Sequence, residues 1–266
     1  YCPVNYDGKF HGPQGLRFSL GNSYNIPAVK MLAVDGVENF VASSSAFGIN
    51  SFKNSKNYGL SLTLGGGEVK MTEMATAFSS FANRGVVKEL NPILKIEDKF
   101  GKTLYKFESP NFVPDIKKPL NYPSFFSIGG KKPISEETAF IISHILLDDN
   151  ARSQAFGAGS LLVIPGHAVS VKTGTTDDKR DNWTIGYTPN FMTTVWVGNN
   201  DNTPMNPYLA SGVTGAAPIW NRVMRYLLKN QPDLWPIRPD TVVGKQICWD
   251  SGDLMVKKDD GTESCS

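Results

Sequence analysis

The chain has 266 residues, which suits one large domain or two small ones and leaves room for a buried core. Hydrophobic residues make up 40% and charged residues 20%, which is typical of a globular protein and excludes a disordered chain. The net charge is only +2, and the densest basic run is the pair Lys117-Lys118. We therefore expect no nucleic-acid partner.

No apolar run reaches the length of a membrane-spanning helix. The longest, residues 139–147, is interrupted by Ser143 and His144 and predicts a buried helix. The chain opens on Tyr1 without a signal peptide, so we expect a processed or partial product of a longer protein.

The sequence holds three cysteines, Cys2, Cys248 and Cys265. A disulfide between the last two would close a loop in an oxidising compartment and contribute about 3 kcal/mol. Two free thiols are the alternative, and the sequence leaves both open. No C-x-x-C pair occurs and the histidines stand at no ligand spacing, so we expect neither a metal nor another cofactor.

The first elements are short helices. Residues 1–15 are rich in glycine and proline and predict a loop. A helical pattern over residues 16–20 stalls near Asn22-Ser23, and Pro27 suits the first turn of a new helix over residues 28–32. Residues 37–47 predict another short helix, which Gly48 ends.

Gly65-Gly66-Gly67 follows these helices. A phosphate-binding loop would need a following Lys-Ser/Thr or a GxGxxG frame, and neither is present, so we favour a flexible turn. Thr72 is predicted to cap a helix over residues 73–83, with Gly85 as its stop. One face of this helix is apolar, through Met74, Ala77, Phe78 and Phe81.

Residues 93–105 alternate around Phe100-Gly101-Lys102 and predict a β-hairpin. Residues 107–133, with several prolines, predict a long loop. Ser135 then caps a predicted helix over residues 136–147.

The clearest region predicts three strands, at residues 168–176, 183–187 and 191–197, joined by short polar turns. Such short connections require antiparallel neighbours. A helix over residues 218–228 follows, and Ile219, Val223, Tyr226 and Leu227 are predicted to cover the sheet. The expected fold is therefore α/β, an antiparallel sheet flanked by helices on both faces.

The strongest chemical signal is Lys172-Thr173-Gly174-Thr175-Thr176 on the first of these strands. A lysine gives positive potential, the hydroxyls can bind a carboxylate, and a glycine lets a peptide approach the strand edge. An amide on that edge can also stabilise an oxyanion. Alone, the triplet is more often an ordinary strand.

Ser23-Tyr24-Asn25 is the second signal, in the break between two helices. A serine hydroxyl and an asparagine amide could face a cleft there, although helix capping is the more common role of such residues.

Together the two motifs resemble part of the active-site set of penicillin-binding proteins and class A β-lactamases, S-x-x-K, S-D-N and K-T-G. The flanks resemble class A (bifunctional) penicillin-binding proteins in the same order along nearly the whole chain. These flanking segments are residues 5–9, 23–30, 61–65, 81–85, 181–183, 186–189, 195–198 and 217–220.

The resemblance implies an extracytoplasmic D,D-transpeptidase that cross-links peptidoglycan stem peptides through an acyl-enzyme and binds β-lactams. It implies that Ser23 relays a proton, Asn25 binds the substrate amide and Lys172 supplies the positive potential. Thr173 and Thr175 would bind the terminal carboxylate, and the Thr175 N–H would form half of the oxyanion hole. The expected site is catalytic Ser23, Asn25 and Lys172, with Thr173, Gly174, Thr175 and Thr176 for substrate.

The sequence departs from the pattern in one respect: no serine is followed by a lysine three positions later. The chain then resembles the C-terminal two-thirds of the domain. Three explanations of the missing upstream part compete. It is a separate chain produced by proteolysis, it lies outside the segment given by this sequence, or it has been lost in a natural pseudoenzyme. We expect that missing part as a partner, and an N-terminal membrane anchor in the parent protein.

Two further readings stay open: a D,D-carboxypeptidase or β-lactamase-type hydrolase, and a non-catalytic peptide-binding module. The expected organisation is a transpeptidase domain over residues 1–235 and a tail over residues 236–266.

Overall fold

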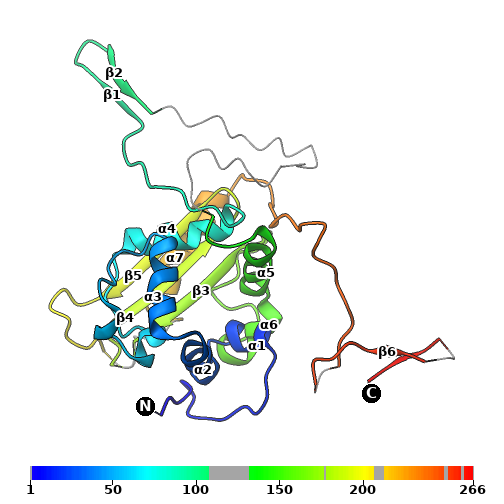
Figure 1. Ribbon diagram of the computed structural model, residues 1–266. Helices are drawn as coiled ribbons and strands as arrows, with labels where there is room; N and C mark the ends of the chain where they lie inside the picture. The colour runs from blue at the N-terminus through cyan, green and yellow to red at the C-terminus, as the bar shows by residue number, and fades with distance from the viewer. Residues whose placement is uncertain are drawn as a thin grey trace.

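The computed structural model describes residues 2–107, 132–176, 178–206, 213–248, 251–258 and 261–265. At its centre lies an antiparallel sheet in the order β3-β4-β5, as Figure 1 shows. These strands are β3 (Ser170–Thr175), β4 (Asp181–Tyr187) and β5 (Met192–Gly198). Thr188 N–H donates to the Phe191 carbonyl at 2.8 Å in the turn between β4 and β5. The three predicted strands and their antiparallel order are confirmed.

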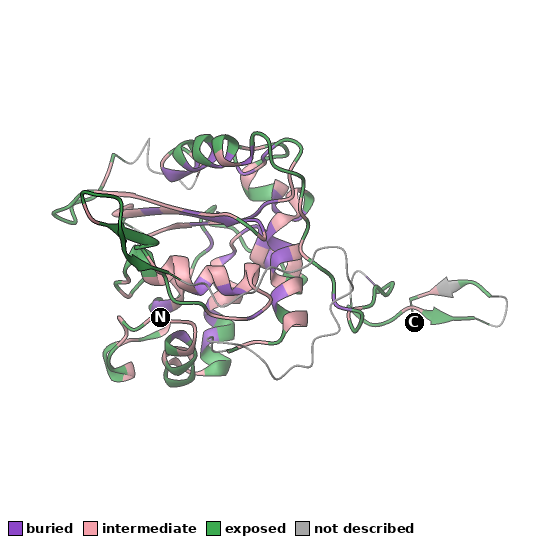
Figure 2. Cartoon of the chain, turned by 90° about the horizontal axis from the view of Figure 1, so that it is seen from above, coloured by how far each residue is buried: buried purple, intermediate pink, exposed green. Residues whose placement is uncertain are grey.

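Helices cover both faces of this sheet, so the predicted α/β class is also confirmed. One face packs on α7 (Ala216–Leu228), where Trp220 lies so close to Gly186 that no Cβ would fit there. The other face meets α4 (Met71–Ala82) and α5 (Glu136–Leu147). Figure 2 shows buried residues concentrated along the sheet and on the helix surfaces that face it.

The face of α7 that covers the sheet differs from the prediction. Ile219, Val223 and Tyr226 are 50%, 39% and 81% exposed, so they point away from the sheet, and only Leu227 packs at the edge of the core. The buried stripe is Ala216, Ala217, Trp220, Asn221, Met224 and Leu228. Most of these residues recur every four positions, and the two alanines let the helix approach the strands closely.

The first half of the chain forms α1 (Leu16–Gly21), α2 (Asn25–Asp35) and α3 (Val37–Ala46), followed by the short 3-10 helices η1 (Ser55–Asn57) and η2 (Leu60–Leu64). The helix α2 begins three residues earlier than predicted.

The glycine turn after η2 is packed rather than open. Gly65 has φ +96 and ends η2, while a Cβ at Gly67 would collide with Leu62 and Phe52. The predicted turn is confirmed, but its expected looseness is not, because neighbouring side chains fill the space around it.

Two predicted helix starts have opposite outcomes. The Ser135 hydroxyl accepts from the Thr138 N–H and caps α5, as predicted. Thr72 does not cap α4, which begins at Met71 after Lys70. An additional helix, α6 (Asp149–Phe156), was not predicted; the Asp148 side chain caps it.

Two segments extend from the body in Figure 1. The predicted hairpin is confirmed as β1 (Lys95–Glu97) and β2 (Thr103–Lys106), all exposed. Most of the predicted 107–133 loop lies outside the described residues. The tail carries β6 (Val256–Lys257) and β7 (Glu263–Ser264), and a disulfide joins Cys248 to Cys265. The division of the chain near residue 235 stays a prediction.

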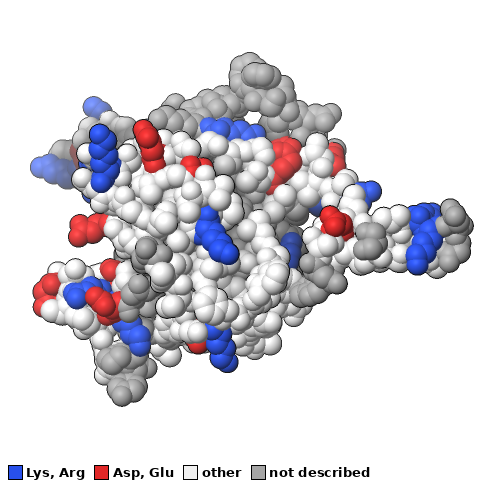
Figure 3. Space-filling model, turned by 60° about the horizontal axis from the view of Figure 1, so that its bottom comes forward, with Lys and Arg blue, Asp and Glu red and all other residues white. Residues whose placement is uncertain are grey.

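The surface shows no dominant sign of charge: basic and acidic side chains are interspersed across the face in Figure 3. Among the described residues, none of the helices combines the length and apolarity that crossing a bilayer requires.

Candidate active site

Ser23 occupies the turn between α1 and α2 in a strained backbone conformation. The Ser23 N–H donates to the Leu20 carbonyl at 3.2 Å, and the Tyr24 N–H donates to the Ser19 carbonyl at 3.0 Å. These two bonds are those of a Schellman motif, which places its turning residue in the left-handed region. Ser23 has φ 59, where glycine is the usual residue. A serine at this position keeps a hydroxyl at the cost of backbone strain.

The N-terminal segment braces this turn. The Asn5 side-chain oxygen accepts from the Ile26 N–H at 3.2 Å and so caps α2 from a distant part of the chain. The Asn25 amide donates to the Val4 carbonyl at 2.9 Å. His11 stacks on Tyr24 with 4.2 Å between the ring centroids. The segment therefore contacts the residues that directly follow Ser23.

Lys172 on β3 reaches Ser23 across 149 residues of sequence. Its Nζ donates to the Ser23 Oγ at 2.6 Å and to the Thr173 carbonyl at 2.7 Å. Burial lowers the pKa of the Lys172 ammonium from 10.5 to about 8, because the charged form loses solvation. The two predicted motifs thus meet at a hydroxyl held by an amine that titrates near neutral pH.

The threonines of β3 lie on the opposite side of the strand from Lys172, as its alternation requires. Thr173 is buried there, on the face that packs on α7. The Thr175 Oγ1 accepts from the Asn182 amide at 2.9 Å, across the β3–β4 pair. Thr175 itself remains partly exposed near the end of the strand.

Thr176 holds the turn that follows β3. Its Oγ1 accepts from the Asp181 N–H at 2.9 Å and from the Arg180 N–H at 3.1 Å. A Cβ at Gly174 would meet only Trp183, at an ordinary 3.7 Å. No close contact within the described part of the chain therefore requires glycine at position 174.

The structure brings Ser23 and Lys172 into contact, while the Asn25 amide bonds to the N-terminal segment and Thr176 to its own turn. Sequence reasoning missed the roles of Asn5 and Asn182. Both lie in segments that carried the family resemblance, Asn5-Tyr6-Asp7-Gly8-Lys9 and Asp181-Asn182-Trp183, but the helix N–H groups that they cap lie 21 and 34 residues away in the sequence.

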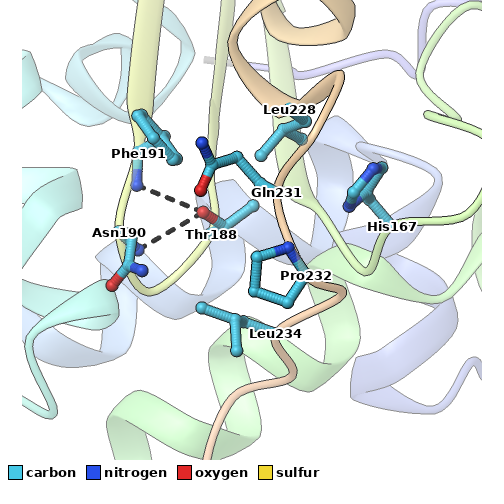
Figure 4. Close-up of a pocket in the computed structure, with 8 residues that line it drawn as sticks. All are labelled: His167, Thr188, Asn190, Phe191, Leu228, Gln231, Pro232 and Leu234. Atoms are coloured by element: carbon cyan, nitrogen blue, oxygen red, sulfur yellow. Dashed lines mark hydrogen bonds between the residues drawn. The ribbon is translucent and has the colours of Figure 1, made fainter.

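A small hollow lies at the other end of the sheet, beside the β4–β5 turn (Figure 4). The Thr188 hydroxyl accepts there from the backbone N–H groups of Asn190 and Phe191, at 3.3 and 3.1 Å. The rest of the hollow is lined by His167, Leu228, Gln231, Pro232 and Leu234. It holds none of the predicted site residues.

In the part of the chain that the structure describes, no group of three or more His, Cys, Asp or Glu residues is arranged to hold a metal ion.

Comparison with known proteins shows the family of the chain. Residues 5–225 match the family described as penicillin binding protein transpeptidase domain, and the chain belongs to this family. Its relatives include penicillin-binding protein 1C of Escherichia coli K12, 30% identical over 97% of this chain and 29% of the relative. Penicillin-binding protein 1A of Clostridium acetobutylicum is 31% identical over 85% of this chain and 25% of its own. The chain thus spans less than a third of these relatives.

Solved structures show the same fold. Penicillin-binding protein 1A from Haemophilus influenzae superposes with a TM-score of 0.77 at 27% identity, over 99% of this chain and 41% of that chain. The PonA1 protein from Mycobacterium tuberculosis, solved in complex with penicillin V, superposes with a TM-score of 0.67 over 89% of this chain and 62% of its own. At 19% identity, this second likeness concerns the fold alone.

Proposed function

We propose that this chain supplies the Ser23, Asn25 and Lys172 side of a D,D-transpeptidase site that cross-links peptidoglycan stem peptides. The contact between the Lys172 Nζ and the Ser23 Oγ carries the proposal, because it joins the two family motifs in one partly buried pair. Membership of the transpeptidase family supports it.

The reaction has two steps. A serine outside the motifs of this chain attacks the carbonyl carbon of the D-Ala-D-Ala bond, and an ester forms as the C–N bond breaks. The attacking hydroxyl gives its proton to the lysine of its own Ser-x-x-Lys segment. The leaving D-Ala amine needs a proton, which Ser23 donates while Lys172 replaces it. An amine of a second stem peptide then attacks the ester; its proton returns through Ser23 to Lys172, and the released serine takes its own proton back from the lysine of its segment. A β-lactam undergoes the same first step: the serine attacks its ring carbonyl, the ring C–N bond breaks, and an ester forms.

The edge strand β3 would hold the substrate. Thr175 donates its hydroxyl to the terminal carboxylate, and the Thr175 N–H points at the developing oxyanion. Thr173 is buried on the face that packs on α7, so the hydroxyl of Thr175 is the one exposed to the substrate. Gly174 leaves the strand edge open to a peptide backbone, and Asn25 binds the substrate amide. Thr176 acts through the turn that it holds.

The partner of this chain is the segment that carries Ser-x-x-Lys. Among the described strands β5 pairs only with β4, so its second edge is free to receive another strand. We place the assembled domain outside the cytoplasmic membrane, in a parent protein anchored by an N-terminal helix, and the disulfide supports such a compartment.

Covalent labelling with a fluorescent penicillin tests the function. We expect no labelling of the 266-residue chain, strong labelling once an upstream Ser-x-x-Lys segment is joined to it, and loss of most labelling in Lys172→Ala. The exposed Lys30→Ala on α2 is the matched control and should label as wild type. Robust acylation of the isolated chain, located by peptide mass mapping, would contradict the proposal.

Hydrolysis by a carboxypeptidase or β-lactamase uses the same acyl-enzyme, and only the identity of the acceptor differs. Products decide: cross-linked peptide dimers support transfer, whereas cleaved monomer with no dimer supports hydrolysis. A peptide-binding pseudoenzyme would bind the stem peptide without acylation even with the upstream segment present.

A further inference from the structure

Asn182 is a buried side chain that contacts Thr175 and belongs to neither of the two active-site motifs. It lies on β4 directly opposite Thr175 and is 0% exposed. Its Nδ2 donates to the Thr175 Oγ1 at 2.9 Å, and its Oδ1 accepts from the Ala216 N–H at 2.6 Å. The two bonds connect the first residue of α7 with the end of β3.

The donor and acceptor chemistry of Ala216, Asn182 and Thr175 fixes the direction of both hydrogen bonds. The Ala216 N–H can only donate, so the atom facing it must be the Asn182 oxygen. The amide nitrogen then faces Thr175 and has no lone pair to offer, so the Thr175 oxygen must accept. Because the hydroxyl has a single proton, that proton points away from Asn182.

Within the described part of the chain, the Thr175 hydroxyl donates this proton to no protein acceptor. Thr175 is partly exposed, so the proton is available to a ligand at the end of β3. The bonds also align from the N-terminus of α7, the positive end of its dipole, through the amide to the hydroxyl. Such aligned chains polarise one another and strengthen the last donor.

We propose that Asn182 is a positioning residue that turns the Thr175 hydroxyl into a one-way donor toward the carboxylate of the substrate. This inference rests on the proposed function. Asn182 also supplies the cap that α7 lacks, since the N-cap residue Gly215 has no side chain for this task. A purely structural cap would affect α7 but not the recognition of a carboxylate, and this difference makes the inference testable.

The test compares acylation of the full-length protein by a penicillin acid with acylation by its methyl ester. The nucleophilic serine opens the β-lactam C–N bond in both, so only the carboxylate differs. We expect Asn182→Ala to reduce the preference for the acid about tenfold, since a donor to a charged group is weakened. In a Thr175→Val background the same substitution should leave the preference unchanged, because the hydroxyl is already gone.

Asn221→Ala is the matched control. Asn221 is another buried asparagine of the α7 layer, and its amide donates to the Leu161 carbonyl at 2.8 Å. This variant should lose thermal stability and keep the preference for the acid. If Asn182→Ala does not fold, Asn182→Asp keeps an acceptor for Ala216, and its ionised carboxylate takes the Thr175 proton, so the preference should again fall.

The outcomes separate the inference from the function. A wild-type protein that neither ligand acylates, or that does not prefer the acid, overturns both. A wild-type protein that prefers the acid while Asn182→Ala or Asn182→Asp retains that preference overturns only the role of Asn182. An equal loss with and without the Thr175 hydroxyl does the same, because it would show a purely structural effect.

Discussion

The hydroxyls of Ser23 and Thr175 lie on opposite sides of β3, yet each accepts a hydrogen bond from a nitrogen of the protein. At Ser23 the donor is the Lys172 ammonium, at 2.6 Å; at Thr175 it is the Asn182 amide, at 2.9 Å. Both arrangements leave the hydroxyl proton for a ligand. The difference is that an amine can lose its proton and an amide cannot. One hydroxyl can therefore exchange protons, while the other can only bind.

Removal of the Lys172 ammonium, the donor that can titrate, should have the largest effect on the acylation rate. Lys172→Met in the full-length protein should lower the acylation rate by about 10²–10³-fold, within the range of general acid–base contributions. Stopped-flow measurement of penicillin acylation checks this. Lys30→Met, on the exposed side of α2, is the control and should acylate at the wild-type rate.

The same variant should be more stable than wild type. Burial holds the pKa of Lys172 near 8 against 10.5, so the ammonium costs up to about 3 kcal/mol below pH 8. The unfolded chain binds more protons between pH 8 and 10.5, so wild-type stability rises with pH through that window. The advantage of Lys172→Met in urea unfolding should shrink from pH 7 to pH 10. An advantage that stays constant would contradict a desolvated ammonium.

Deletion of the two hydroxyls should separate proton transfer from binding. Ser23→Ala should lower the maximal acylation rate about 100-fold, because the leaving amine loses its proton donor. Thr175→Val should mainly weaken the binding of the acid, about tenfold. Rates measured over a range of penicillin concentrations distinguish the two. If Ser23→Ala and Thr175→Val both change only the maximal rate, or both change only the binding of the acid, the proposed difference between the two hydroxyls is wrong.

The pH profile should follow only one of the two hydroxyls. When Lys172 loses its proton above about pH 8, it can no longer replace the proton that Ser23 donates, so acylation should fall with a midpoint near that pH. Thr175→Val should keep the midpoint, since the Asn182 amide does not titrate. A midpoint that moves in Thr175→Val would show that the two hydroxyls are coupled.

The smallest effect concerns the backbone. Ser23→Gly should be about 1 kcal/mol more stable than Ser23→Ala, because φ 59 favours glycine. At Thr175, which lies within a strand, we expect the reverse: Thr175→Gly should be less stable than Thr175→Ala. Thermal denaturation of the four variants measures both differences. Equal stability of the two Ser23 variants would exclude strain in the turn.

The sequence predicted the sheet well because short turns leave the three strands no other arrangement. It also predicted Ser23 and Lys172 as one site, through the family resemblance, although 149 residues separate them. It failed at α7, where two apolar stripes compete: the branched and aromatic side chains looked suited to the core, but the stripe with alanines approaches the strands.

The helix caps that Asn5 and Asn182 supply could not be predicted, for a different reason. An asparagine that caps a distant helix has no local pattern, because its partner is an amide 21 or 34 residues away in sequence. Such contacts depend on how the helices dock, which periodicity does not encode. The helix α6 was missed because its sequence is polar, although Asp148 offered a capping signal.

The disulfide between Cys248 and Cys265 makes the end of the chain a self-contained unit. Bonds inside the loop, such as Cys248 N–H to the Asp253 carbonyl and Lys258 N–H to the Thr262 carbonyl, set its shape within its own boundaries. The apolar residues Leu254 and Val256 of this loop are exposed, so the disulfide stabilises the loop instead of a hydrophobic core. We expect such a loop to tolerate trimming, exchange or an inserted reporter while the central sheet and its helices keep their own packing.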